Sequence, residues 1–136
     1  MTAKQQCGFT LIEALVALLV LSIGLLGVAA MQLKSLQSAH AGYQRSVATL
    51  AAMDAQERTW AKLAEVDDCP SGSDISTISS DWVEQWFGDG KIMSDAGNSQ
   101  VAEEDDCEYK VTVNWEEHRL EAGDGRFEYL YRLPDI

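Results

Sequence analysis

An uninterrupted apolar run dominates the first part of the chain. From Ala14 to Met31 the sequence reads ALVALLVLSIGLLGVAAM, without a charged residue. The apolar positions fall on every face of a helix, which is typical of a membrane segment and not of a core helix in a small domain. The run approaches the roughly 20 residues that span a bilayer. The pattern therefore predicts a helix that sits in the membrane.

Two simpler interpretations of residues 1–33 stay open. In a secretory signal peptide, Lys4 would supply the basic region and residues 28–30 (VAA) a cleavage site, although the run is longer than the usual apolar region of such peptides. In a plain membrane anchor, charge would not fix the orientation, because Lys4 precedes the run while Lys34 and Arg45 follow it.

A second pattern follows the apolar run. Between residues 33 and 64, apolar residues recur at spacings of three, four or seven, which indicates one face of an α-helix, and polar residues such as Arg45 and Lys62 fill the other face. We predict a single helix from about Thr10 to Ala64, ended by the CPSG segment at residues 69–72. The side chains that this pattern assigns to the core are Leu36, Tyr43, Val47, Leu50, Met53, Trp60 and Leu63.

Residues 71–107 have the composition of a loop-rich insert. Within it, residues 81–87 (DWVEQWF) predict a short helix capped by Ser80 or Asp81. Trp82, Trp86 and Phe87 fall on one side of that helix, so we expect them to dock it on the long helix. An exposed aromatic binding patch is the alternative.

Two alternating segments near the carboxyl terminus predict strands. Residues 109–115 (YKVTVNW) alternate strictly, which indicates a half-buried strand, and residues 127–133 (FEYLYRL) form the second. Residues 121–125 (EAGDG) carry the turn between them. An antiparallel hairpin packed on a long amino-terminal helix, whose first half is transmembrane, makes the fold class α+β.

The charge distribution limits the classes of molecule that this protein is expected to bind. The formal net charge is -12, and from Glu65 to Glu108 the acidic residues are opposed by Lys91 alone. A surface of this sign argues against direct nucleic-acid binding, which needs clustered Lys and Arg. The acids predict a solvated surface. Calcium binding by residues 103–106 (EEDD) is the alternative, although consecutive acids lack the spaced oxygen ligands of known calcium loops.

Three cysteines occur in the 136 residues: Cys7, Cys69 and Cys107. About 100 residues remain beyond the apolar run, and a domain of that size often needs covalent support. If this part lies outside the cytoplasm, a Cys69–Cys107 disulfide is expected. Free buried thiols are the alternative. A metal site is not expected, because His40 and His118 are far from both cysteines in the sequence.

Glu13 lies at the start of the apolar run. An ionised side chain costs several kcal/mol in such a membrane segment, so its presence suggests a functional role. The residues around it, GFTLIE at 8–13, are followed by about 18 apolar residues. This segment resembles the class III signal of type IV prepilins and pseudopilins. The resemblance implies that Gly8 ends a leader, that a prepilin peptidase cuts after it, and that the new amino-terminal Phe9 is N-methylated. Cys7 would leave with the leader.

The same resemblance implies an assembly role for Glu13, the fifth residue of the mature chain. Its expected partner is the free amino group of Phe9 on a neighbouring subunit, since a carboxylate in a helix bundle needs a positive partner. At an effective dielectric constant near 20 and about 4 Å, such a pair gains about 4 kcal/mol before desolvation. Glu13 would therefore direct assembly and register rather than stabilise the lone subunit.

The following segment sharpens the resemblance. Residues 19–58, including QLKSLQSA, Tyr43 and Arg45, are similar to PilV-type minor pilins, the type IV pilus modification proteins. The major subunits of that family often carry a proline late in this helix, where this chain has Ala30. The implied domains are a leader at 1–8, a hydrophobic transmembrane and filament-core helix at 9–33, its amphipathic continuation at 34–66, and a globular domain with an insert and a carboxyl-terminal hairpin at 67–136.

No catalytic constellation, phosphate loop or cofactor motif is evident in the sequence, so we expect a structural protein and not an enzyme. The resemblance implies a minor pilin that primes or tips a type IV pilus and supports adhesion or twitching motility. A pseudopilin of a type II secretion system is the alternative, and a membrane-anchored ligand-binding or enzymatic domain is a third. The implied partners are prepilin peptidase and other minor and major pilins, contacted through the amino-terminal helix. The implied location is the bacterial inner membrane, single-pass with a periplasmic domain, and then the extracellular pilus.

Overall fold

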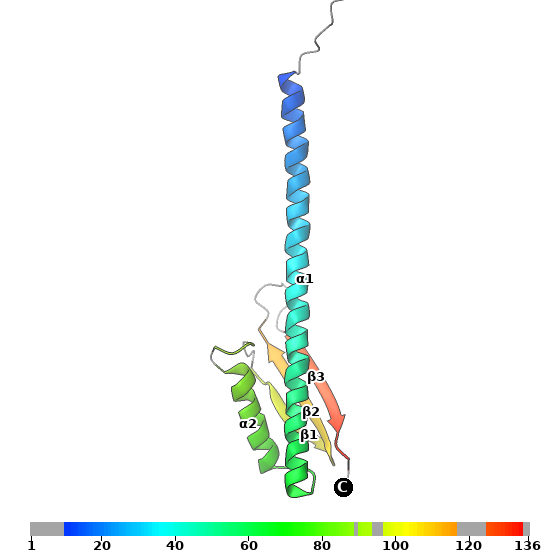
Figure 1. The fold of residues 1–136 in the computed structure, drawn as a ribbon, viewed down its shortest axis with the longest axis vertical. Helices are drawn as coiled ribbons and strands as arrows, with labels where there is room; N and C mark the ends of the chain where they lie inside the picture. Colours follow the sequence, from blue (N-terminus) through cyan, green and yellow to red (C-terminus); the bar gives the residue numbers. More distant parts are fainter. Residues whose placement is uncertain (1–9, 89, 94–96, 117–124, 135–136) are drawn as a thin grey trace, which may run out of the picture. The chain divides into compact units, whose positions relative to one another are not determined.

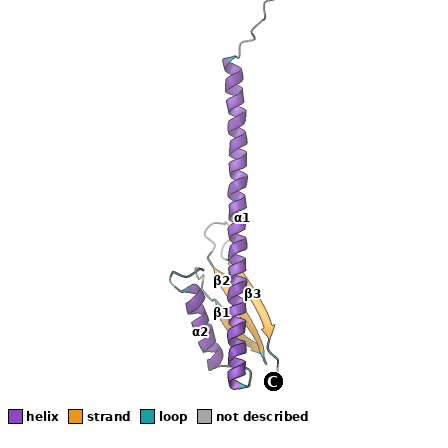
Figure 2. Ribbon diagram, viewed as in Figure 1, coloured by secondary structure: helices purple, strands orange, loops and turns teal. Residues whose placement is uncertain are grey.

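The computed structural model describes residues 10–88, 90–93, 97–116 and 125–134. In chain order the elements are α1 (Leu11–Val66), α2 (Ser73–Phe87), β1 (Gln100–Asp105), β2 (Glu108–Trp115) and β3 (Gly125–Arg132) (Figures 1 and 2). This long amino-terminal helix followed by a small antiparallel sheet is the α+β, pilin-like fold that the sequence predicts. The chain divides into two compact units, Met1–Ala39 and His40–Ile136, and α1 contributes to both.

The predicted long helix is confirmed. α1 runs without interruption from Leu11 to Val66, so Gly24, Gly27 and Ser22 do not break it. The Ser22 hydroxyl donates to the Leu18 carbonyl at 2.7 Å, within the helix. At its far end the Asp67 amide donates to the Leu63 carbonyl at 2.9 Å. The chain then turns away at the predicted 69–72 segment, where Gly72 adopts a positive φ of 52° that a residue without Cβ tolerates best.

In the unit His40–Ile136 the sheet has the order β1-β2-β3, and both pairs are antiparallel. The predicted hairpin is present as β2 and β3, with Val111 opposite Tyr129 and Trp115 opposite Gly125. A Cβ at Gly125 would overlap the Trp115 ring, so glycine is required at the start of β3. The predicted turn at 121–124 lies outside the described residues.

Two expectations for residues 71–107 are wrong. This region is not mainly loop, because α2 begins at Ser73, eight residues before the predicted start, and β1 adds a third strand. Because the helix already begins at Ser73, Ser80 and Asp81 lie inside it and do not cap it. Gly72 precedes the helix, and no side-chain hydrogen bond caps its first turn. The serines and threonines of its first turns donate back to helix carbonyls, such as Thr77 to Ser73 at 2.9 Å, which satisfies them without ending the helix.

β2 is the central strand, and its burial departs from strict alternation. Val111 and Val113 are fully buried as expected, but Thr112 between them is buried as well. In register, Thr112 lies between Gln100 of β1 and Glu128 of β3. Side chains of both flanking strands can therefore cover it on the face away from the core.

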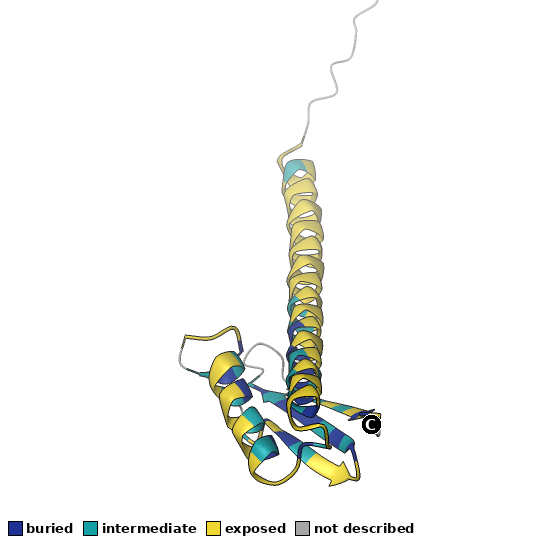
Figure 3. Ribbon diagram, turned by 60° about the horizontal axis from the view of Figure 1, so that its bottom comes forward, coloured by how far each residue is buried: buried dark blue, intermediate teal, exposed yellow. Residues whose placement is uncertain are grey.

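The core of this unit lies between the sheet and the part of α1 after residue 40. Tyr131 and Thr59 share a hydrogen bond of 2.8 Å, and the Tyr129 hydroxyl donates to Gln56 at 2.9 Å, so α1 lies across one face of the sheet (Figure 3). Three tyrosine rings stack across β2 and β3. The ring of Tyr131 lies between those of Tyr109 and Tyr129, with centroid distances of 5.6 Å to Tyr109 and 5.7 Å to Tyr129.

The expected docking of α2 on the long helix is confirmed. The indole of Trp82, which is fully buried, donates to the Ala51 carbonyl at 2.8 Å. The indole of Trp86 donates to Asp54 at 2.8 Å. Phe87 is buried edge-on against Trp82, at a centroid distance of 5.3 Å. Trp82 and Phe87 are therefore core residues and Trp86 is half-buried against them, so the alternative of an exposed aromatic patch is wrong.

Candidate assembly surface on helix α1

The first turn of α1 holds Glu13, the residue for which the resemblance to prepilins implies a role in assembly. The Glu13 and Ala14 amides donate to the Thr10 carbonyl at 3.0 and 3.2 Å, which starts the helix at this point. A carboxylate in the first turn is favoured by the helix dipole. The Glu13 side chain is exposed, and no ion pair joins it to any residue that the structure describes. Gly8 and Phe9 lie outside the described residues.

The segment after Glu13 exposes its apolar side chains on all sides. Every residue from Leu15 to Met31 is exposed, and the helix is long and apolar enough to cross a membrane (Figure 3). A Cβ at Gly24 or Gly27 would meet nothing within 4 Å. Soluble monomers rarely expose an apolar surface of this extent. The surface therefore requires lipid or other helices as its environment.

The second part of α1 buries a different face from the predicted one. Of the seven predicted core residues, Val47 and Leu63 are buried, whereas the other five are exposed. The face that meets the sheet consists mostly of small residues: Val47, Ala48, Ala51, Ala52, Ala55, Thr59 and Leu63. Alanine lets the helix approach the bulky sheet side chains closely, and this packing decides which face is buried.

Four of the large residues form an outward stripe in the unit His40–Ile136. Tyr43 and Leu50 are each 58% exposed, Met53 is 54% exposed and Trp60 is 39% exposed. They lie on the side of α1 opposite its alanine-rich face. The sequence reasoning missed this surface because it took every large apolar residue as core. The run of alanines on the other face was the signal that could have revealed it.

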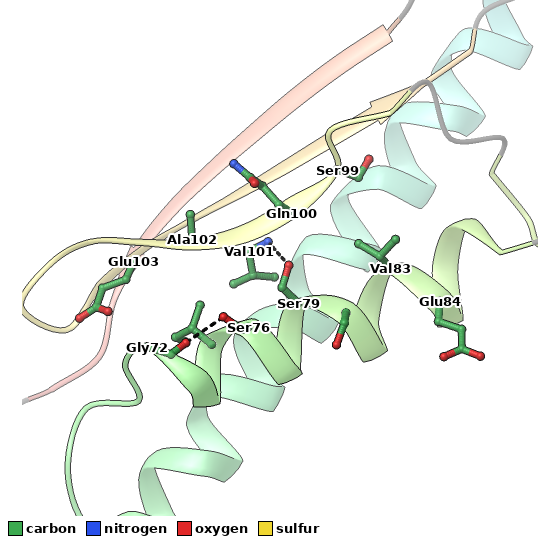
Figure 4. A pocket seen from close by; sticks show the side chains of 12 residues that line it. Gly72, Ser76, Ser79, Val83, Glu84, Ser99, Gln100, Val101, Ala102 and Glu103 are labelled. Carbon is green, nitrogen blue, oxygen red and sulfur yellow. Dashed lines mark hydrogen bonds between the residues drawn. The ribbon is translucent and has the colours of Figure 1, made fainter.

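A shallow groove of about 740 Å³ lies between α2 and β1 (Figure 4). Ile75, Val83 and Val101 supply most of its apolar lining, and the polar lining consists of four serines with Glu84, Gln100 and Glu103. Ser79 accepts a hydrogen bond from the Val101 amide at 3.0 Å, which covers part of the free edge of β1. Ser76 donates to the Gly72 carbonyl at 3.0 Å. These two hydroxyls therefore already make hydrogen bonds within the fold.

The buried tyrosines are structural groups. Burial, with a weaker contribution from nearby Glu103 and Asp68, raises the pKa of Tyr109 to about 12. Its hydroxyl donates to the Pro70 carbonyl at 2.8 Å. Burial likewise raises the pKa of Tyr131 to about 12, although the hydrogen bond with Thr59 opposes the shift. Both phenols therefore stay neutral at physiological pH and fasten the sheet to α1 and to the segment that follows it.

The disulfide expected between Cys69 and Cys107 is present, with the two Cα atoms 5.4 Å apart. It joins the segment after α1 to the two-residue turn between β1 and β2, where Cys107 has a positive φ of 58°. Acidic residues surround it, including Asp68, Glu103 and Asp106. Within the part of the chain that the structure describes, no group of three His, Cys, Asp or Glu side chains is arranged to hold a metal ion.

Comparison with known protein families identifies one motif. A family model described as the prokaryotic N-terminal methylation motif matches residues 3–29. The match includes the predicted cleavage position, Phe9, Glu13 and most of the apolar run. No curated protein matches the chain. No solved structure matches it either.

The matched motif indicates a pilin- or pseudopilin-like protein that is processed as a prepilin. It implies cleavage by a prepilin peptidase and assembly with pilins. Together with the apolar helix, it indicates that the protein is first anchored in the membrane. Proteins with this motif are structural subunits rather than catalysts. The fold agrees with that class, since a long helix with a small antiparallel sheet follows the motif.

Proposed function

We propose that this chain is a minor pilin of a type IV pilus, which enters the priming or tip complex and supports adhesion or twitching motility. The observation that carries the proposal is the GFTLIE segment at residues 8–13, which heads an uncharged helix inside the matched motif. The similarity of residues 19–58 to PilV-type minor pilins favours this class over a secretion pseudopilin. The Cys69–Cys107 disulfide suits a periplasmic and then extracellular domain.

The proposed mechanism uses the exposed carboxylate at the head of α1. Prepilin peptidase removes residues 1–8, and Phe9 becomes an N-methylated terminus four residues before Glu13. In the inner membrane Glu13 has no counter-charge among the described residues of its own chain. In the filament it pairs with the Phe9 amino group of a neighbouring subunit. An unpaired Glu13 carboxylate is costly in the membrane, and the ion pair in the filament removes that cost, which favours assembly.

The experiment that tests the proposal measures the mature terminus. Mass spectrometry of the full-length protein from its native membrane should find a chain that starts at a methylated Phe9. A Gly8→Ala variant should accumulate as the uncleaved precursor. A normal mature mass in that variant would contradict the leader assignment.

A second measurement tests the role of Glu13. Glu13→Ala should insert into the membrane but be largely missing from sheared filaments, whereas Glu13→Asp, which keeps the charge, should retain more incorporation. Deletion of the gene should reduce pilus number and twitching. Loss of protein secretion with pili unaffected would assign the chain to a type II secretion system instead.

A further inference from the structure

The two edges of the sheet are covered differently. β1 forms one edge and β3 the other, because the strand order is β1-β2-β3. α2 lies along β1, and its Ser79 hydroxyl accepts a hydrogen bond from the Val101 amide, a donor that points away from β2 (Figure 4). Beside β3, no helix or strand that the structure describes lies on the side away from β2 (Figure 1). Within the described part of the chain, the edge of β3 is therefore open.

The register shows which backbone groups form this open edge. Because the Val101 amide points away from β2, Val101 and Val111 are a non-hydrogen-bonded pair, and such pairs alternate with hydrogen-bonded ones in an antiparallel ladder. The backbone groups of Val111 therefore point to β3, where Tyr129 lies opposite. The Leu133 amide, which donates to the Cys107 carbonyl at 2.8 Å, continues the same alternation. The residues of β3 whose N–H and C=O groups point to the open edge are Arg126, Glu128, Leu130 and Arg132.

This edge is suited to receive another strand. The outward backbone groups of Arg126, Glu128 and Leu130 have no hydrogen bond to any residue that the structure describes, and unpaired groups at this spacing are a template for strand addition. Charged side chains on an edge can oppose such pairing. Here they are paired within the sheet, Arg126 with Glu128 and Arg132 with Glu108, while the apolar Leu130 is 57% exposed.

A second copy of this chain does not fit the open edge. Tyr129 bonds to Gln56 and Tyr131 to Thr59, so β3 runs in the same direction as α1. Two β3 edges related by a two-fold axis would pair antiparallel, with the two α1 helices in opposite directions. Copies anchored in one membrane by the start of α1 need helices that run in the same direction. The β1 edge of another copy is already covered by α2.

We infer that the open edge of β3 binds an extended segment of a different protein, which adds a fourth strand to the sheet. The main chain of that segment supplies the hydrogen bonds that Arg126, Glu128 and Leu130 lack, and the Leu130 side chain contacts its outer face. The inference does not depend on whether the chain serves a pilus or a secretion system. It concerns the unit His40–Ile136 and not the apolar helix.

Photo-crosslinking in the native cell tests the contact. A photoreactive phenylalanine analogue replaces Leu130 in the full chain, and the matched control carries it at Thr77, which is exposed on α2. The Leu130 position should give an adduct with one other protein, and mass spectrometry should map the joined peptide to a single segment of it. The Thr77 position should not give that adduct. An adduct of two copies of this chain, or adducts with lipid alone, would overturn the inference.

A proline variant tests whether the contact is strand pairing. Glu128→Pro removes one outward N–H and leaves the hydrogen bonds to β2 in place, which an edge strand tolerates. Glu128→Ala loses the same side chain but keeps the N–H, so it is the matched control. Glu128→Pro should lower the yield of the Leu130 adduct by at least about tenfold, because a hydrogen bond is lost and a carbonyl of the partner is left unpaired. Glu128→Ala should retain most of the yield, and equal yields in the two variants would overturn strand addition.

Amide hydrogen exchange of the unchanged full chain gives a second test, which does not depend on how well the proline variant folds. In the chain purified in detergent, the outward amides of β3 should exchange fast and those bonded to β2 slowly. In native membranes the outward amides should become at least about tenfold slower, since the added strand accepts their hydrogen bonds. The exposed amino-terminal turn of α2 is the internal control and should exchange equally in both samples. Fast exchange of the outward amides in both samples would overturn the inference.

Discussion

The two faces of α1 after residue 40 differ chiefly in side-chain size. The inner face, which meets the sheet, carries Ala48, Ala51, Ala52 and Ala55, all essentially inaccessible to solvent. The outward stripe carries larger and more apolar side chains that stay exposed. If hydrophobicity alone chose the buried face, the helix would be turned the other way. The comparison teaches that fit to the partner surface decides the orientation.

The sheet explains why small residues are buried. Its inner face presents Tyr109, Val111, Val113, Trp115 and Tyr131, all buried. Interiors are packed at the density of organic crystals, so large groups on one layer require small groups on the facing layer. The large side chains of the outward stripe, on the other side of the helix, stay exposed.

Removing the disulfide should have the largest effect on the inner packing. Cys69 and Cys107 close a loop of 38 residues, and the chain-entropy model gives about 3–4 kcal/mol for such a loop. The double variant Cys69→Ala, Cys107→Ala should lose about that much unfolding free energy. Denaturant titration of the full chain in detergent, followed by tryptophan fluorescence, measures it. Cys7→Ser is the control and should match the unchanged chain.

Enlarging the inner face should come next. Ala51 is fully buried beneath Trp82, so the added atoms of Ala51→Leu have no space. Overpacking of this kind costs about 1–3 kcal/mol, and the same titration should show it. Ala61→Leu, at an exposed position of the same helix, is the control and should change the unfolding free energy little. An Ala51→Leu variant as stable as the unchanged chain would show that the inner face is not tightly packed.

The sequence predicted the elements whose pattern depends on the chain alone. The apolar run and the long helix follow from composition and period, and β2 and β3 follow from alternation. The exposure of Leu50 and Trp60 could not be predicted in this way, because it depends on the shape of a sheet that begins 40 residues after Trp60. Apolar periodicity predicts which face of a helix is buried, and here packing against the sheet buries the alanine-rich face instead.

The missed strand β1 has a related cause. Its residues, QVAEED, alternate only at the start, and its outer part is exposed and acidic. β1 forms because a two-residue turn places it beside the edge of β2, with which it pairs in antiparallel register. α2 was predicted too short because its serines suggested a cap. Of the candidate site, Glu13 was placed correctly on a helix, while the pairing proposed for it involves another subunit and is not seen in a single chain.

High pH should weaken the inner packing gradually. Tyr131 titrates near pH 10 when unfolded and at about 12 in the fold. Its contribution is therefore fully present below pH 10 and is lost as the pH rises from 10 to 12. The unfolding free energy should fall by about 1–2 kcal/mol across that window. In Tyr131→Phe, measured in parallel, the fall should be smaller, with Tyr109 supplying what remains. An equal fall in both proteins would contradict the assignment to Tyr131.

The smallest effect on stability should come from Leu50→Ala, and this variant tests the comparison most directly. Leu50 and Ala51 are neighbours in sequence but lie on opposite faces of α1. Because Leu50 loses little surface on folding, its truncation should change the unfolding free energy by less than about 0.5 kcal/mol. A loss of 2 kcal/mol or more, the range of a buried leucine, would mean that Leu50 belongs to the core. A variant that keeps its stability, beside a destabilised Ala51→Leu, supports the assignment of Leu50 to the exposed side of α1 and of Ala51 to its buried face.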